Sequence, residues 1–153
     1  MTQQLDVSAQ LAGGMRFEVE TGSGYALRLD MAREEGGEGA GAQPMEMLLV
    51  GLAGCAGMSN LLLLRRGGQD VHSYEIRIHG VRAGAHPQVF TQITVEHLIS
   101  GVQIRPEEVE RALRLTEQKY CGASAMLEQT ARISHTWRLI AVQGRPANHQ
   151  EKR

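Results

Sequence analysis

The sequence has little of several features that would narrow its function at once. Its 153 residues carry a net charge of −1, so it offers no strongly basic surface for DNA or RNA. Residues 1–10 lack the basic segment and following apolar stretch of a signal peptide, and we therefore expect a cytoplasmic protein. Cysteine occurs twice, without a Cys-x-x-Cys motif. In a reducing compartment, two such cysteines serve packing or chemistry rather than a structural disulfide.

The sequence also lacks the residue spacings that are typical of metal sites and of phosphate-binding loops. Six histidines are present, but none shows His-x-x-x-His spacing, so we expect no metal site. The Gly-Gly pairs lack the strand–glycine–helix context of a phosphate loop, and we expect no cofactor. His135 is in phase with Ile133 and Trp137 of an alternating pattern, which favours a hydrogen-bonded core histidine.

Apolar periodicity predicts an α+β fold with antiparallel sheets. Strands are expected in 15–30 (a hairpin turning at 21–24), 71–83, 89–100 and 132–142. Helices are expected over 45–65, 106–120 and 124–129. The glycine-rich segment 31–43 is expected to be a mobile loop. We predict one domain over 1–142, followed by a polar tail over 143–153 that we expect to be disordered.

The predicted helix 45–65 is unusually apolar. No charged residue occurs between positions 47 and 64, and apolar side chains fall on every face. Such a helix lies either in a membrane or at the centre of a protein. Three interior glycines and flanking amphipathic strands favour a buried central helix and no membrane. Because one small domain cannot cover every face of this helix, a second copy of the chain is expected to complete its burial in a homodimer.

Three segments in order resemble one known family. Segments 43–55 (QPMEMLLVGLAGC), 86–91 (HPQVFT) and 119–127 (KYCGASAML) are similar to the OsmC and organic hydroperoxide resistance proteins. The last two segments resemble the less characterised third branch of that family. The resemblance extends from about Gly13 to Ile140, and it implies an intertwined OsmC-like homodimer with active sites at the dimer interface.

The resemblance also implies roles for individual residues. Cys55 corresponds to the peroxidatic thiol and Cys121 to the resolving thiol. Arg16, next to the Gly13-Gly14 pair, corresponds to the arginine that stabilises the thiolate, and Glu46 corresponds to the glutamate that positions this arginine. The residues alone leave alternatives open, since Arg16 fits a solvated strand arginine and Glu46 fits a partner of the helix N-terminus.

The function expected from this resemblance is thiol-dependent reduction of organic hydroperoxides in oxidative-stress defence. A thiolate attacks the O–O bond and becomes a sulfenic acid, which needs a second thiol to form a disulfide. An external dithiol would then reduce the Cys55–Cys121 disulfide. The alternative is a non-catalytic OsmC-like protein that binds a small hydrophobic molecule in the dimer cleft.

Overall fold

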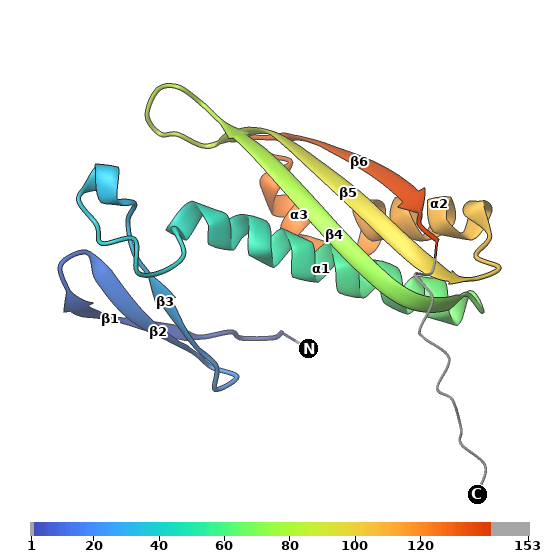
Figure 1. Cartoon of the computed structure of the whole chain (residues 1–153), viewed down its shortest axis with the longest axis horizontal. Coiled ribbons are helices and arrows are strands. Elements are labelled where there is room, and N and C mark those ends of the chain that lie inside the picture. The colour runs from blue at the N-terminus through green and yellow to red at the C-terminus, as the bar shows by residue number, and fades with distance from the viewer. Residues whose placement is uncertain (1, 142–153) are drawn as a thin grey trace, which may run out of the picture. The chain divides into compact units, whose positions relative to one another are not determined.

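A computed structural model describes residues 2–141, so the predicted tail at 143–153 lies outside the described part. The chain has an α+β fold, and its elements are coloured in order in Figure 1. They are β1 (Val7–Gly13), β2 (Arg16–Thr21), β3 (Ala26–Leu29), α1 (Pro44–Arg66), β4 (Asp70–Arg82), β5 (Phe90–Val102), α2 (Pro106–Leu115), α3 (Gly122–Leu127) and β6 (Arg132–Leu139). The chain divides into two compact units, with the boundary between Gly51 and Leu52 of α1.

The N-terminal unit is built on an antiparallel sheet in the order β1-β2-β3. The hairpin between β2 and β3 turns at Thr21–Gly24, as the sequence predicts, with Gly24 in the left-handed region. Strand β1 adds a further hairpin, which turns at Gly14 and Met15 between the paired residues Gly13 and Arg16. This sheet buries little on its own, since only Val19 among its apolar residues falls within the core.

The loop between β3 and α1 has a defined structure, whereas the sequence predicts a mobile loop. Asp30 is buried, and its carboxylate accepts hydrogen bonds from the backbone N–H groups of Met31, Glu38 and Ala40 at 2.8–3.1 Å. The bond from Ala40 is the largest cause that lowers the pKa of Asp30. The ionised carboxylate of Asp30 therefore links three positions of the glycine-rich segment through hydrogen bonds.

The C-terminal unit contains a mixed sheet in the order β4-β5-β6, which corrects the expectation of antiparallel sheets alone. Strands β4 and β5 form an antiparallel hairpin, whereas β6 runs parallel to β5, with Gln92 opposite Arg132. The connection from β5 to β6 contains α2 and α3. A connection of this length can return the chain to the same end of the sheet, as a parallel pair requires.

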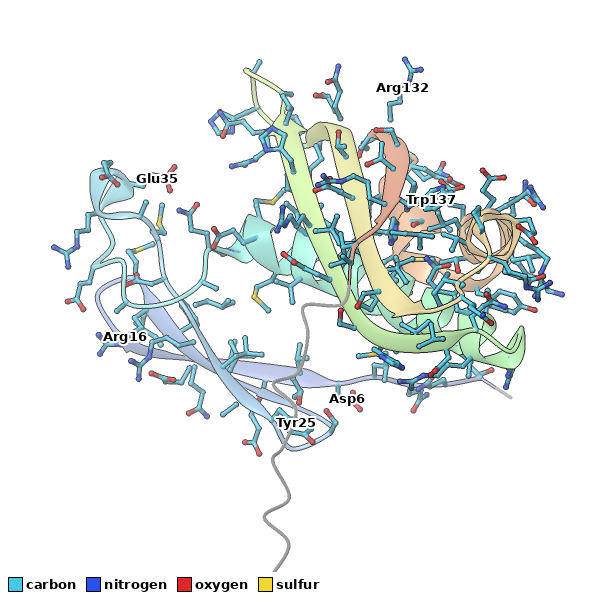
Figure 2. The ribbon with its side chains drawn as sticks, turned by 45° about the vertical axis from the view of Figure 1, so that its right-hand side comes forward. Asp6, Arg16, Tyr25, Glu35, Arg132 and Trp137 are labelled. Carbon is cyan, nitrogen blue, oxygen red and sulfur yellow. The ribbon has the colours of Figure 1, made fainter. Side chains whose placement is uncertain are left out.

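The second half of α1 packs in the C-terminal unit through one row of residues. Leu52, Ala56, Asn60 and Leu64 recur every four positions and are buried, as expected for one face of a helix. Leu64 joins Ile99 of β5 and three residues of α2 in a shared core (Val109, Ala112 and Leu113). Trp137 of β6, labelled in Figure 2, packs against this core.

The remaining apolar side chains of α1 stay uncovered in the single chain. Leu48, Val50, Met58 and Leu62 are between 47% and 76% exposed. By length and composition α1 also meets the criteria for a membrane-spanning helix, which the core helices of soluble proteins meet as well. The helix predicted to be buried is thus buried on one side within this chain.

Candidate functional site

The two cysteines, far apart in sequence, are neighbours in the C-terminal unit. Cys55 lies in the middle of α1 and is partly exposed, while Cys121 is 3% exposed and directly precedes α3. Both are free thiols, and Cys55 is near enough to Cys121 to affect the pKa of the Cys121 thiol. The pair predicted for the resolving step is therefore brought together by α1 and the segment between α2 and α3.

The surroundings of Cys121 keep its proton in place. Burial is the largest influence and raises the pKa of the Cys121 thiol, which hydrogen bonds from Ser124 lower in part. The Ser124 N–H donates to Cys121 Sγ at 3.4 Å. The neighbouring Cys55 thiol raises the pKa of Cys121 further. Cys121 is therefore a thiol that keeps its proton near neutral pH, next to the partly exposed Cys55.

Arg16 is held in the N-terminal unit, at the start of β2 (Figure 2). Its Nη1 forms an ion pair with Glu38 Oε2 at 2.8 Å, and its Nη2 donates to the carbonyl oxygen of Ala12 at 3.3 Å. The turn beneath it requires glycine, since Gly13 and Gly14 have φ of 131° and 56°. Arg16 is therefore a fixed cation that remains 28% exposed.

Glu46, predicted to position Arg16, forms a different contact in this structure. Its Oε2 accepts a hydrogen bond from the Gln43 N–H at 2.9 Å, directly before Pro44 begins α1. This is the backbone-capping half of a capping box, which agrees with the alternative of a helix-terminus partner. The carboxylate that meets Arg16 is that of Glu38. The sequence did not predict this role for Glu38, because the glycine-rich loop has no apolar periodicity that would indicate where its side chains lie.

A buried series of polar side chains, here called the polar chain, lies in the same unit as the two cysteines. Asn60 Nδ2 donates to the Tyr74 hydroxyl at 2.9 Å, and this hydroxyl bonds His97 Nδ1 at 2.5 Å. His97 Nε2 bonds His135 Nδ1 at 2.9 Å. The polar chain comprises Thr116, Asn60, Tyr74, His97, His135 and Glu117.

Both ends of the polar chain lie on the turn that leads to Cys121. Thr116 Oγ1 donates to Asn60 Oδ1 at 3.3 Å. At the other end, Glu117 Oε1 stands 3.2 Å from His135 Nε2, although outside hydrogen-bonding geometry. His135 bonds His97, and its side chain is 6% exposed, which confirms the prediction of a hydrogen-bonded inward-facing histidine at this position.

Burial sets the protonation of the polar chain. Desolvation lowers the pKa of His97 to about 4, with the neighbouring His135 contributing in the same direction. Desolvation also lowers the pKa of His135, which Glu117 raises in part. Burial raises the pKa of Tyr74 to about 12. His97, His135 and Tyr74 are therefore uncharged at neutral pH.

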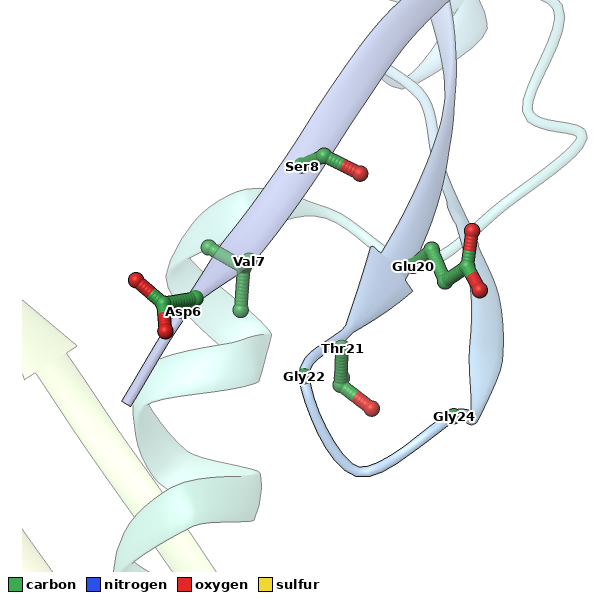
Figure 3. A pocket seen from close by; sticks show the side chains of 7 residues that line it. All are labelled: Asp6, Val7, Ser8, Glu20, Thr21, Gly22 and Gly24. Carbon is green, nitrogen blue, oxygen red and sulfur yellow. The ribbon is translucent and has the colours of Figure 1, made fainter. Parts of the chain in front are cut away.

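A separate hollow of about 340 Å³ lies at the end of the β1–β2 pair in the N-terminal unit (Figure 3). It is open to solvent, and its lining is Asp6, Val7, Ser8, Glu20, Thr21, Gly22 and Gly24. The residues lining it include no thiol and no histidine. Within residues 2–141, no three His, Cys, Asp or Glu side chains are grouped so that they could hold a metal ion.

Fold and site together define a class: an α+β protein with a pair of free thiols, one partly exposed and one buried. The family model described as OsmC-like protein matches residues 36–136, and the chain belongs to this family. Protein YhfA of Escherichia coli K12 is 32% identical over 129 residues, which cover 84% of this chain and 92% of YhfA.

Two solved structures illustrate the shared fold. A hypothetical protein from Aquifex aeolicus VF5 has a TM-score of 0.81 and 25% identity, covering 92% of this chain and 98% of the other. An organic hydroperoxide resistance protein OsmC from Legionella pneumophila has a TM-score of 0.70 and 19% identity, covering 90% and 98%. These similarities support the α+β fold.

Proposed function

We propose that the chain is a thiol-dependent hydroperoxide reductase that acts on organic hydroperoxides. The observation that carries the proposal is the contact between partly exposed Cys55 and buried Cys121, whose proton is retained by its surroundings. Membership of the OsmC-like family supports it. The name of the Legionella protein, which describes resistance to organic hydroperoxides, indicates the substrate class.

In the first step, the Cys55 thiolate attacks the distal oxygen of the hydroperoxide. The O–O bond breaks, Cys55 becomes a sulfenic acid, and the departing alkoxide takes a proton from solvent to leave as an alcohol. We assign Arg16 to this step because it corresponds to the arginine that stabilises the thiolate in the proteins that the sequence resembles, and a nearby cation favours a thiolate. Glu38 holds the guanidinium in place through the 2.8 Å ion pair.

In the second step, Cys121 attacks the sulfur of the Cys55 sulfenic acid. The S–S bond forms as the S–O bond breaks, and the thiol proton of Cys121 leaves with the hydroxyl as water. An external dithiol then returns both cysteines to thiols by exchange. The apolar composition of α1 around Cys55 favours an organic substrate over hydrogen peroxide.

The test is consumption of cumene hydroperoxide with dithiothreitol as the external dithiol. We expect turnover by wild type, none by Cys55→Ser, and wild-type rates for the control Ser59→Ala on the same helix. Without reductant, one equivalent of peroxide should give an intramolecular disulfide in wild type and a stable sulfenic acid in Cys121→Ser, both visible by mass spectrometry. A Cys55→Ser variant as fast as wild type would contradict the proposal.

We further propose that the active form is a homodimer in the cytoplasm. Leu48, Gly51, Met58 and Leu62 are separated by three, seven and four positions, which places them along one side of α1. The three side chains are about half exposed or more, and a Cβ on Gly51 would meet no atom of the described chain within 4 Å. A second copy of α1 fits this apolar seam, and the same seam contains the partly exposed Cys55.

A further inference from the structure

The polar chain begins and ends on a single short turn. Residues Thr116–Tyr120 form a π-helical turn between α2 and α3, and Cys121 follows directly. Thr116 and Glu117, the first two residues of this turn, are the two ends of the polar chain. The turn closes when the Cys121 N–H donates to the Thr116 carbonyl oxygen at 2.8 Å.

The other members of the polar chain connect this turn to the helix of Cys55 and to the whole sheet. Asn60 stands on α1, five positions after Cys55, and is fully buried. Tyr74, His97 and His135 come from β4, β5 and β6 respectively. Asn60 thus bonds both the turn before Cys121 and the sheet that supports α1.

We propose that the polar chain positions Cys121 for disulfide closure with Cys55. A disulfide forms only within a narrow range of separation and torsion. A π-helical turn is an irregular element with no strong preference of its own and is often found at functional sites. Asn60, His97 and Thr116 are almost completely buried. Because water does not reach their polar groups, a hydrogen bond that is lost there is not replaced. These hydrogen bonds therefore favour a single conformation of the turn before Cys121.

This inference rests on the proposed function but concerns its second step alone. The step is the condensation of the Cys121 thiol with the Cys55 sulfenic acid, which releases water. Within residues 2–141, no side chain of the polar chain forms a hydrogen bond with either sulfur, so the polar chain acts through the position of the turn. Members of the polar chain are therefore positioning residues and not catalytic ones.

Thr116→Val is the sharpest variant, because valine keeps the shape of threonine and removes only the hydroxyl that bonds Asn60. Peroxide oxidation is followed by rapid alkylation and mass spectrometry, which times sulfenic acid formation and disulfide closure separately. We expect the ratio of closure rate to oxidation rate to fall by about tenfold, the effect of one buried hydrogen bond. A 1,3-diketone probe should then label Cys55 as the accumulating sulfenic acid.

Conservative variants separate positioning from general damage to the fold. Thr116→Ser restores the hydroxyl and should restore closure, and Tyr74→Phe should reproduce the defect by breaking the polar chain at its centre. Thr130→Val serves as the control, because its hydroxyl bonds Leu127 on the exposed surface and should leave closure unchanged. Thr116→Val and Tyr74→Phe closing as fast as wild type would overturn the inference.

Equilibrium with glutathione provides a test that needs no peroxide. The effective concentration of the Cys55–Cys121 pair follows from its exchange with reduced and oxidised glutathione. We expect Thr116→Val and Tyr74→Phe to lower this effective concentration by about tenfold, and Thr116→Ser to retain it. If wild type consumes no peroxide, the proposed function fails, and this measurement alone decides whether the polar chain positions the thiols.

Discussion

At the scale of single residues, the two cysteines are the same chemical group made different by their surroundings. Cys121 is buried, and desolvation together with the neighbouring Cys55 thiol raises its pKa. Cys55 is partly exposed on the side of α1 that carries uncovered apolar residues. This difference sets the order of events in the proposed reaction. The partly exposed Cys55 meets the peroxide first, and the buried Cys121 then reacts as a protonated thiol.

Arg16 is the residue on which activation of Cys55 is expected to depend. We predict that Arg16→Ala slows the first, oxidation step by at least about tenfold, since a lost cation reduces the thiolate fraction by that order. Stopped-flow measurement of cumene hydroperoxide reduction at pH 7 checks this. Glu38→Gln should slow the same step less, because the guanidinium remains but loses its 2.8 Å ion pair.

Arg28→Ala is the matched control for this prediction. Arg28 lies on β3 of the same sheet and forms a 2.6 Å ion pair with Glu18, with both side chains about half exposed. Removing it should leave peroxide reduction unchanged, because exposed ion pairs contribute little. Equal rates for wild type and Arg16→Ala would show that another group activates Cys55.

At the scale of secondary structure elements, the polar chain makes the stability of the C-terminal unit depend on pH. His97 is fully buried, its pKa is lowered to about 4, and it faces Tyr74 and His135, with Glu117 beyond. In the unfolded chain, His97 takes up a proton below about pH 6.5, whereas in the folded protein it does so only near pH 4. This difference does not reduce the free energy of unfolding above about pH 6.5, but it lowers that free energy progressively as the pH falls from about 6.5 toward 4.

We predict that the free energy of unfolding decreases between pH 7 and pH 4, by an amount on the order of 3 kcal/mol from His97 alone. Urea unfolding at pH 7.5, 6 and 5 measures it. His97→Gln should be less stable at pH 7.5 but show a flatter dependence on pH. His79→Gln, at an exposed position of β4, should keep the wild-type slope. A wild-type curve that is flat down to pH 5 would be inconsistent with a buried neutral His97.

Local sequence signals located most elements correctly. Pro44 and the Gly67-Gly68 pair bound α1 as predicted, and β4 and β5 form the predicted hairpin. The helix predicted over 106–120 instead ends as α2 at Leu115 and continues as the π-helical turn. The apolar spacing of this segment continues through the turn, so periodicity did not reveal the change.

Long-range features could not be predicted in the same way. Alternation along β6 shows which side chains face inward but not whether the strand runs parallel to β5. The polar chain joins five separate elements, so its members share no sequence spacing. Cys55 and Cys121 were identified through resemblance to a family, and only the fold shows that their side chains lie within reach of each other.

At the scale of the whole molecule, the uncovered side of α1 leads to a prediction about assembly. Met58 is 76% exposed on the apolar seam, and Met126 of α3 is 79% exposed. We predict that wild type sediments as a dimer at micromolar concentration, because contiguous apolar surface of this kind marks an interaction site. Met58→Asp should shift the protein toward monomer, whereas Met126→Asp, matched in residue and exposure, should not.

Sedimentation velocity of the three proteins decides the question. A folded wild-type monomer at micromolar concentration would show that the exposed side of α1 needs no second copy. Equal dissociation of Met58→Asp and Met126→Asp would place the interface elsewhere or indicate a general effect of the added charge. Circular dichroism at the same concentration verifies that each variant is folded.

The parallel pairing of β6 with β5 also affects the order in which a newly made chain acquires its thiol pair. Cys121 lies in a crossover whose far end is fixed only when β6 joins the sheet. Ribosomes add about 5–20 residues per second, so several seconds separate the synthesis of Cys55 from that of β6. During that interval the nascent chain carries Cys55 without its partner. In the proposed function, a Cys55 sulfenic acid formed during that interval has no positioned Cys121 thiol with which to form a disulfide.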